Sequence, residues 1–175
     1  EQDFKIKLSN APRIKLGQLT EDAQQPSATQ HALCHYFNQH GVHAESSNHI
    51  LKHLHQKLII NASLNALGAL YQCTHQQLLD QQSSAVKALC EESTSILNHI
   101  QFEPSSDTLW QDIQALMPTI GSNMSSMLQD IQRKKSTEIE YINGYLVDLA
   151  QKHGLPCPLN QNICERIEAY TLPHV

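Results

Sequence analysis

The feature that most constrains the fold is a stretch running from residue 47 to the end of the chain, in which apolar residues recur at helical spacing. The first helix is expected from about Asn48 to Tyr71, with the core candidates Ile50, Leu51, Leu54, Leu58, Leu67 and Leu70. Later helices are expected over about 74–100 with a bend near residue 84, 107–117, 124–133, 137–153 and 160–170. Thr74 with Gln77 and Thr137 with Glu140 form capping-box patterns, and Asp107 is the expected cap of the helix that ends before Pro118. The sequence therefore predicts a mainly α fold.

The first 46 residues follow a different pattern. Apolar and polar residues alternate over 4–8 and 14–16, as in short β-strands. Ser27 and Gln30 form a capping-box pattern that begins a helix, Gly41 ends it, and a short extended segment follows. Such a strand–strand–helix–strand piece cannot bury a core by itself, so we expect it to be the end of a larger domain upstream. The chain begins with Glu1 rather than Met, which also indicates a fragment.

Composition and charge narrow the class of protein. Of the 175 residues 40% are hydrophobic and 17% charged, which predicts a soluble globular protein without a membrane span or a signal peptide. A net charge of -5 and scattered lysines argue against nucleic acid or an anionic membrane as partner. The five cysteines show no CxxC spacing, so free thiols in a cytoplasmic protein are expected.

Eleven histidines raise the question of a metal site. His49 and His53 have the i, i+4 spacing of a metal pair, and His31, Cys34 and His35 lie close together in the sequence. No third ligand of suitable spacing completes either set. We therefore interpret them as surface histidines and predict no metal.

A polar stripe crosses the longest predicted helix. Lys57, Asn61 and Asn65 are four residues apart, which places them on one helix face among strongly apolar neighbours. One interpretation is a solvated face, which every amphipathic helix has. The other is the lining of a ligand pocket, in which a lysine can donate a proton.

A second polar cluster lies at residues 123–130, at an expected helix start. Free backbone N–H groups there favour an anion such as a carboxylate, although ordinary N-capping explains the same residues. Glu138 falls in the first turn of the next helix. It either complements the helix dipole or, with the core residue Ile142 four positions on, lies at the edge of the core facing a cleft.

Together these two clusters resemble the ketopantoate reductase (2-dehydropantoate 2-reductase) family over about residues 52–167. The resemblance is carried by KLIINASLN at 57–65, by SSMLQD at 125–130, by TEIEYING at 137–144, and by Gly154, Pro158 and Asn160. The family usually has proline where this chain has Ala66. It has a substrate-contacting asparagine followed by glycine where this chain has His75 and Gln76.

The resemblance implies a fold and an activity. Residues 1–46 would be the remnant of a nucleotide-binding Rossmann domain. Residues 47–175 would form a helical substrate-binding and catalytic domain of the 6-phosphogluconate-dehydrogenase-like type. The family reduces ketopantoate to pantoate with NADPH, on the route to pantothenate and coenzyme A.

The resemblance also implies roles for single residues. Lys57 matches the proton donor to the substrate carbonyl, and Asn61 and Asn65 match residues that hold the substrate. Ser126 matches the hydroxyl that binds the substrate carboxylate, with Asn123 as a further candidate. Glu138 matches a residue that contacts the cofactor near its reacting end.

The glycine-rich fingerprint GxGxxG is absent from the chain. We therefore expect that most of the NADPH site lies in a missing N-terminal domain and that the chain alone is inactive. Two alternatives stay open: a helical binding or dimerisation module without catalysis, and a reductase acting on another 2-keto acid. The apolar side where the missing domain would dock could also form a homodimer.

Overall fold

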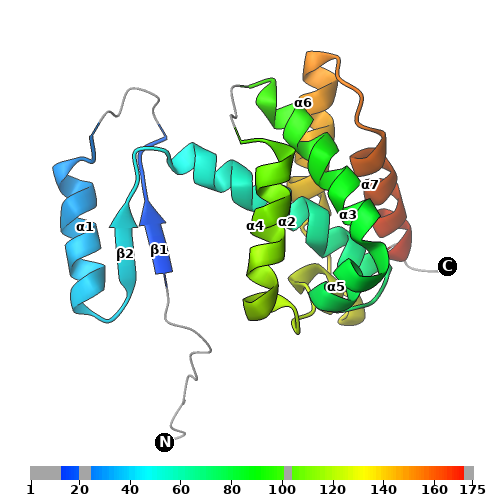
Figure 1. Ribbon diagram of the computed structural model, residues 1–175, viewed down its shortest axis with the longest axis horizontal. Coiled ribbons are helices and arrows are strands. Elements are labelled where there is room, and N and C mark those ends of the chain that lie inside the picture. Colours follow the sequence, from blue (N-terminus) through cyan, green and yellow to red (C-terminus); the bar gives the residue numbers. More distant parts are fainter. Residues whose placement is uncertain (1–12, 20–24, 101–103, 172–175) are drawn as a thin grey trace, which may run out of the picture. The chain divides into compact units, whose positions relative to one another are not determined.

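The computed structural model describes residues 13–19, 25–100 and 104–171 (Figure 1). The chain divides into two compact units, Glu1–Leu54 and His55–Val175. The strand predicted over residues 4–8 lies outside the described residues. No described helix is both long enough and apolar enough to cross a membrane.

In the residues that the structure describes, the first unit has two strands with a helix between them. β1 (Arg13–Leu16) pairs in parallel with β2 (His43–Ser46), and α1 (Ala28–Gln39) packs on β2. The capping box predicted for α1 is present, since Ser27 Oγ accepts from the Gln30 N–H at 3.2 Å and Gln30 Oε1 accepts from the Ser27 N–H at 2.7 Å. The chain leaves α1 through Gly41, whose φ of 79° favours glycine.

The second unit is helical, which confirms the predicted fold class. Its elements are α2 (Ile50–Leu70, which begins in the first unit), α3 (His75–Asn98), α4 (Ser106–Ile120), α5 (Ser126–Gln132), the π-helical turn η1 (Glu140–Gly144), α6 (Tyr145–His153) and α7 (Pro158–Thr171). The predicted bend in the second helix is confirmed, because α3 has a kink at Gln82 (φ -134°, ψ 29°). The capping box predicted at Thr74 and Gln77 is also formed.

The core of the second unit is built from the buried faces of these helices. Its largest fully buried side chains include Ile59, Leu64, Leu89, Leu97, Leu128 and Leu146. The prediction for the start of α2 was partly wrong, since Leu51 and Leu54 are exposed. Both residues precede His55, where the second unit begins. The helical periodicity of the sequence therefore extends beyond the part of α2 that belongs to the second unit and its core.

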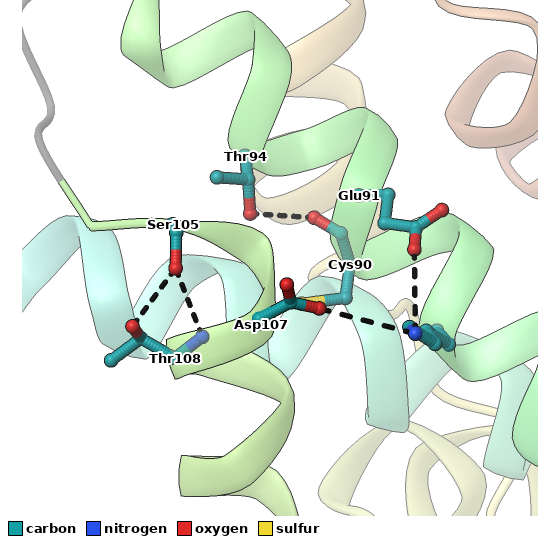
Figure 2. Close-up of polar contacts among 7 residues, drawn as sticks. Cys90, Glu91, Thr94, Ser105, Asp107 and Thr108 are labelled. Carbon is teal, nitrogen blue, oxygen red and sulfur yellow. Dashed lines mark hydrogen bonds and ion pairs between the residues drawn. The ribbon is translucent and has the colours of Figure 1, made fainter.

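The boundaries of α4 differ from the prediction. Ser105, not Asp107, caps the helix, because its Oγ accepts from the Thr108 N–H at 3.2 Å (Figure 2). Asp107 lies instead 4.0 Å from Lys87 Nζ of α3. The helix also passes through Pro118 to Ile120, since a proline this near the C-terminal end removes only one backbone donor.

Candidate functional site

The polar stripe on α2 lies along the edge of the core of the second unit. Lys57 is exposed, while Asn61 and Asn65 are half-buried. On the inner face of the same turns, Ile59 and Leu64 are fully buried. Within the described ranges, no hydrogen bond or ion pair engages the Lys57 ammonium, so it can reach a ligand at this edge.

One serine joins this stripe to the second polar cluster. Ser125 is buried, and its Oγ donates to the backbone carbonyl of Asn65 at 3.1 Å across 60 residues of sequence. The same oxygen accepts from the Leu128 N–H at 3.1 Å and so caps α5. Ser126, the next residue, is exposed. The structure thus brings the start of α5 against the turn of α2 that carries Asn65.

The loop before α5 is fixed against the start of α3. The carbonyl of Asn123 accepts from the His75 N–H at 3.1 Å, and the carbonyl of Gly121 accepts from the Gln76 N–H at 2.8 Å. A Cβ at Gly121 would lie 2.6 Å from the Met117 carbonyl oxygen, so this close approach requires glycine. The Asn123 side chain is exposed beside this junction.

His75, the residue that departs from the family pattern, is buried at this junction. Its side chain is 7% exposed, and its Nδ1 has no hydrogen-bond partner among the described residues. Burial lowers the pKa of His75 below its ordinary value of 6.5, because desolvation disfavours the charged imidazolium. Burial therefore favours the neutral form of the imidazole.

Glu138 is exposed just before the π-helical turn η1. The capping box predicted at Thr137 and Glu140 is wrong, since Thr137 Oγ1 accepts from the Ile139 N–H at 3.4 Å instead. The Glu138 carbonyl accepts from the N–H groups of both Tyr141 (3.0 Å) and Ile142 (3.1 Å). π-Helical turns are rare and are frequently found at functional sites.

A buried network that the sequence did not predict ties η1 to α2. Asn143 is fully buried, and its Nδ2 donates to the Ala62 carbonyl at 3.2 Å and to Asn160 Oδ1 at 2.9 Å. Asn160 Nδ2 in turn donates to Glu92 Oε1 at 2.9 Å. One signal was available in the sequence, because Asn143 lies four residues after Ile139 and therefore on the core stripe of its helix.

The histidine and cysteine groups do not converge. Cys34 is buried, whereas His31 and His35 are exposed. In the part of the chain that the structure describes, no three His, Cys, Asp or Glu side chains are placed to hold a metal ion.

Fold and site together define an all-helical domain with a lysine- and asparagine-bearing edge. The chain matches the family model described as "Ketopantoate reductase PanE/ApbA C terminal" over residues 49–171. It is 33% identical to the 2-dehydropantoate 2-reductase of Salmonella typhi over 121 residues, which are 69% of this chain and 40% of that protein. For the enzyme of Pyrococcus abyssi the identity is 31%, over 71% of this chain and 42% of that protein. The chain therefore belongs to the ketopantoate reductase family and carries its C-terminal domain, and it spans about 40% of the length of these relatives.

Solved structures share the fold. A ketopantoate reductase from Ralstonia eutropha JMP134 superposes with a TM-score of 0.79 at 23% identity, over 93% of this chain and 52% of that one. The ternary structure of D-mandelate dehydrogenase with NADH and anilino(oxo)acetate gives a TM-score of 0.83 at 23% identity, over 94% and 68%. A probable 2-dehydropantoate 2-reductase from Bacillus subtilis gives 0.76 at 25% identity, over 93% and 54%.

Proposed function

We propose that this chain is the substrate-binding and catalytic part of a reductase that converts 2-dehydropantoate (ketopantoate) to (R)-pantoate with NADPH, in pantothenate and coenzyme A biosynthesis. Residues 47–175 form its helical domain, and residues 1–46 are the end of its nucleotide-binding domain. The hydrogen bond between Ser125 and the Asn65 carbonyl carries the proposal, because it joins the start of α5, where Ser126 lies, to the turn of α2 that carries Asn65.

Lys57 is the proposed proton donor to the substrate carbonyl. Addition of a hydride to a ketone places negative charge on the oxygen, and an ammonium beside that oxygen both stabilises the charge and supplies the proton. The exposed position of Lys57, one turn before Asn61, fits a group that reaches a substrate lying on the α2 edge.

Substrate orientation is assigned to the amides and hydroxyl around the lysine. Asn61 and Asn65 are half-buried, so each leaves part of its surface open to a ligand at this edge. Ser126, with Asn123 nearby, would bind the carboxylate of the 2-keto acid. Every 2-keto acid has this carboxylate, so its binding does not distinguish the proposed substrate from the others.

In this proposal the residues of this chain contact a nicotinamide cofactor only at its reacting end. Glu138 is exposed, and its carboxylate can accept hydrogen bonds from ribose or amide groups. A glycine-rich phosphate-binding sequence is absent, so the phosphates of the cofactor would be bound by another part of the protein. NADPH would supply the hydride, and residues 1–175 alone would be inactive.

A reductase of another 2-keto acid is the second candidate. His75 and Gln76 stand where the family has asparagine and glycine, and His75 is buried against the Asn123 loop. The D-mandelate dehydrogenase with a similar fold was crystallised with anilino(oxo)acetate, which carries an aromatic group next to a 2-oxo acid. A changed side chain at position 75 would alter which substituent the site accepts.

The proposed partners are the nucleotide-binding domain and a second copy of the protein. Tyr141 and Tyr145 are exposed one turn apart and offer apolar surface for such contacts. A ketopantoate reductase of Staphylococcus aureus with the same fold (TM-score 0.70, 18% identity) is described as dimeric. All five cysteines are free thiols, which agrees with the proposed cytoplasmic location.

The test is NADPH oxidation by the full-length gene product with ketopantoate, with phenylglyoxylate as a competing aromatic 2-keto acid. Lys57→Ala is compared with Lys52→Ala, an exposed lysine on the same helix. Turnover that collapses only in Lys57→Ala supports the proposal. Turnover with phenylglyoxylate but not with ketopantoate would assign an aromatic 2-keto acid as the substrate. Inactivity with all 2-keto acids would favour a binding module without catalysis.

A further inference from the structure

A chain of buried amides runs behind the polar stripe of α2. Asn143 and Asn160 are both fully buried. Asn143 Nδ2 donates to the Ala62 carbonyl and to Asn160 Oδ1, and Asn160 Nδ2 donates to Glu92 Oε1 (2.9 Å) and Ser93 Oγ (3.3 Å). Four elements, α2, η1, α7 and α3, therefore meet through two side-chain amides. Buried amides are costly unless paired. Both Nδ2 groups and Asn160 Oδ1 are paired, whereas Asn143 Oδ1 has no partner among the described residues.

The hydrogen bonds of this network have a fixed direction. The Glu92 carboxylate can only accept, and it is held by the backbone N–H groups of Leu159 (3.0 Å) and Asn160 (2.8 Å). It therefore turns Nδ2 of Asn160 toward itself and Oδ1 toward Asn143. Asn143 therefore donates to Asn160 Oδ1 through its own Nδ2. The same Nδ2 also donates to the Ala62 carbonyl, which can only accept.

The network holds the turn of α2 that carries the proposed substrate ligands. Ala62 follows Asn61 directly, and three residues later the Asn65 carbonyl accepts from Ser125 Oγ. Carbonyls of an α-helix point along its axis, so donors to two of them fix the position of α2 along that axis. One donor comes from η1, which follows Glu138, and the other from the start of α5.

Asn143 lies on the buried stripe of the segment that contains the π-helical turn η1. Ile142 (8% exposed) and Asn143 (fully buried), three and four residues after the buried Ile139, both face the core. Leu146, three residues later, continues the same buried stripe. Glu138 and the amide of Asn143, which donates to the Ala62 carbonyl of α2, thus lie in one short segment.

We propose that Asn143 is a positioning residue for the reaction: its side-chain amide holds the Asn61–Asn65 turn, and Lys57 one turn before it, in register with the segment that carries Glu138. Asn160 and Glu92 keep that amide in the required orientation. The inference rests on the proposed reductase function, since positioning has meaning only for a reaction at this edge. A displacement of about 1 Å in a catalytic group can cost up to about 100-fold in rate.

The experiment uses the full-length protein and measures single-turnover oxidation of NADPH by the 2-keto acid that the wild type reduces. Asn143→Leu has a similar volume but no donor. It is compared with Leu146→Ala, which loosens the same buried stripe without touching the network. We expect hydride transfer in Asn143→Leu to fall about tenfold or more with an unchanged Kd for NADPH, and Leu146→Ala to stay within about twofold of the wild type.

Glu92→Gln is the second variant, since its site is half-buried and glutamine keeps an acceptor oxygen, so folding is retained. The glutamine side chain can donate as well as accept, so it no longer fixes the orientation of Asn160, and we expect an intermediate loss of about threefold. Wild-type hydride transfer in both variants would overturn the inference, as would an equal loss in Leu146→Ala. A wild type that reduces no 2-keto acid would instead refute the proposed function itself, and the inference with it.

Discussion

Glu92 should contribute more to stability than its half-buried position suggests, because it caps a helix from a distant part of the chain. Its carboxylate accepts from the N–H groups of Leu159 and Asn160, the second and third residues of α7, and from Asn160 Nδ2. The residue before Pro158, which begins α7, is Cys157, a residue type that is not among the preferred N-caps. The helix start therefore depends on a carboxylate 67 residues away.

The magnitude follows from what Glu92→Ala leaves unpaired. Hydrogen bonds to a charged acceptor contribute about 1.5–3 kcal/mol each, and loss of an N-cap costs about 0.5–2 kcal/mol. Water can replace the acceptor at the exposed Leu159, but Asn160 is fully buried. We expect a loss of about 2–4 kcal/mol, which lowers the Tm by roughly 5–15 °C for a chain of this size.

The assay is thermal and urea unfolding of Glu92→Ala beside Glu91→Ala. Glu91 is the neighbouring residue, exposed, with Lys87 at 3.9 Å, and an exposed pair of this kind contributes about 0–1 kcal/mol. Glu92→Gln should fall between the wild type and Glu92→Ala, because it keeps an acceptor but not the charge. Equal Tm values for Glu92→Ala and Glu91→Ala would refute the capping argument.

Three further predictions concern single groups. In the unfolded chain His75 has its ordinary pKa of 6.5, whereas burial lowers the pKa of His75 in the fold. The free energy of unfolding of the wild type should therefore decrease as the pH drops below about 6.5. Urea unfolding of His75→Gln should show a smaller decrease over the same pH range. Burial, and then the Glu92 carboxylate, raise the pKa of Cys157 to about 12, so its alkylation at pH 8 should be slow and should speed up in Glu92→Gln. Ser125→Ala removes a buried N-cap and the hydrogen bond to α2, so it should lower the free energy of unfolding in urea by about 2 kcal/mol. Ser105→Ala removes an exposed N-cap and should lower it by about 1 kcal/mol or less. Equal losses in the two variants would contradict this.

The sequence predicted those features of the helices that depend on residues close together along the chain. The capping boxes at Ser27 and Thr74 are formed, and the bend in α3 is confirmed, because these features depend on residues within one or two turns. The same pattern failed at Thr137, where a π-helical turn replaces the regular helix start. At α4 the predicted cap, Asp107, was wrong, because the hydroxyl of Ser105, two residues earlier, accepts from the Thr108 N–H.

The contacts between distant parts of the chain could not be predicted in this way. The bond from Ser125 spans 60 residues and that from Asn143 to Ala62 spans 81, and no local pattern encodes such pairs. The motif around Asn143 was visible in the sequence, but its partners became apparent only with the packing of α2, η1 and α7. Helical spacing gave the stripe of Lys57 and its asparagines, whereas its relation to Ser126 required the fold.

The most direct test of the central claim is chemical rescue of Lys57→Ala in the full-length protein. Small primary amines are added to the variant, and kcat/KM for NADPH-dependent reduction of ketopantoate is measured against amine concentration and pH. If Lys57 donates the proton, amines should restore turnover, and the pH dependence of the rescue should follow the pKa of each added amine. Absence of rescue by every amine, or a Lys57→Ala variant as active as the wild type, would contradict the role of Lys57.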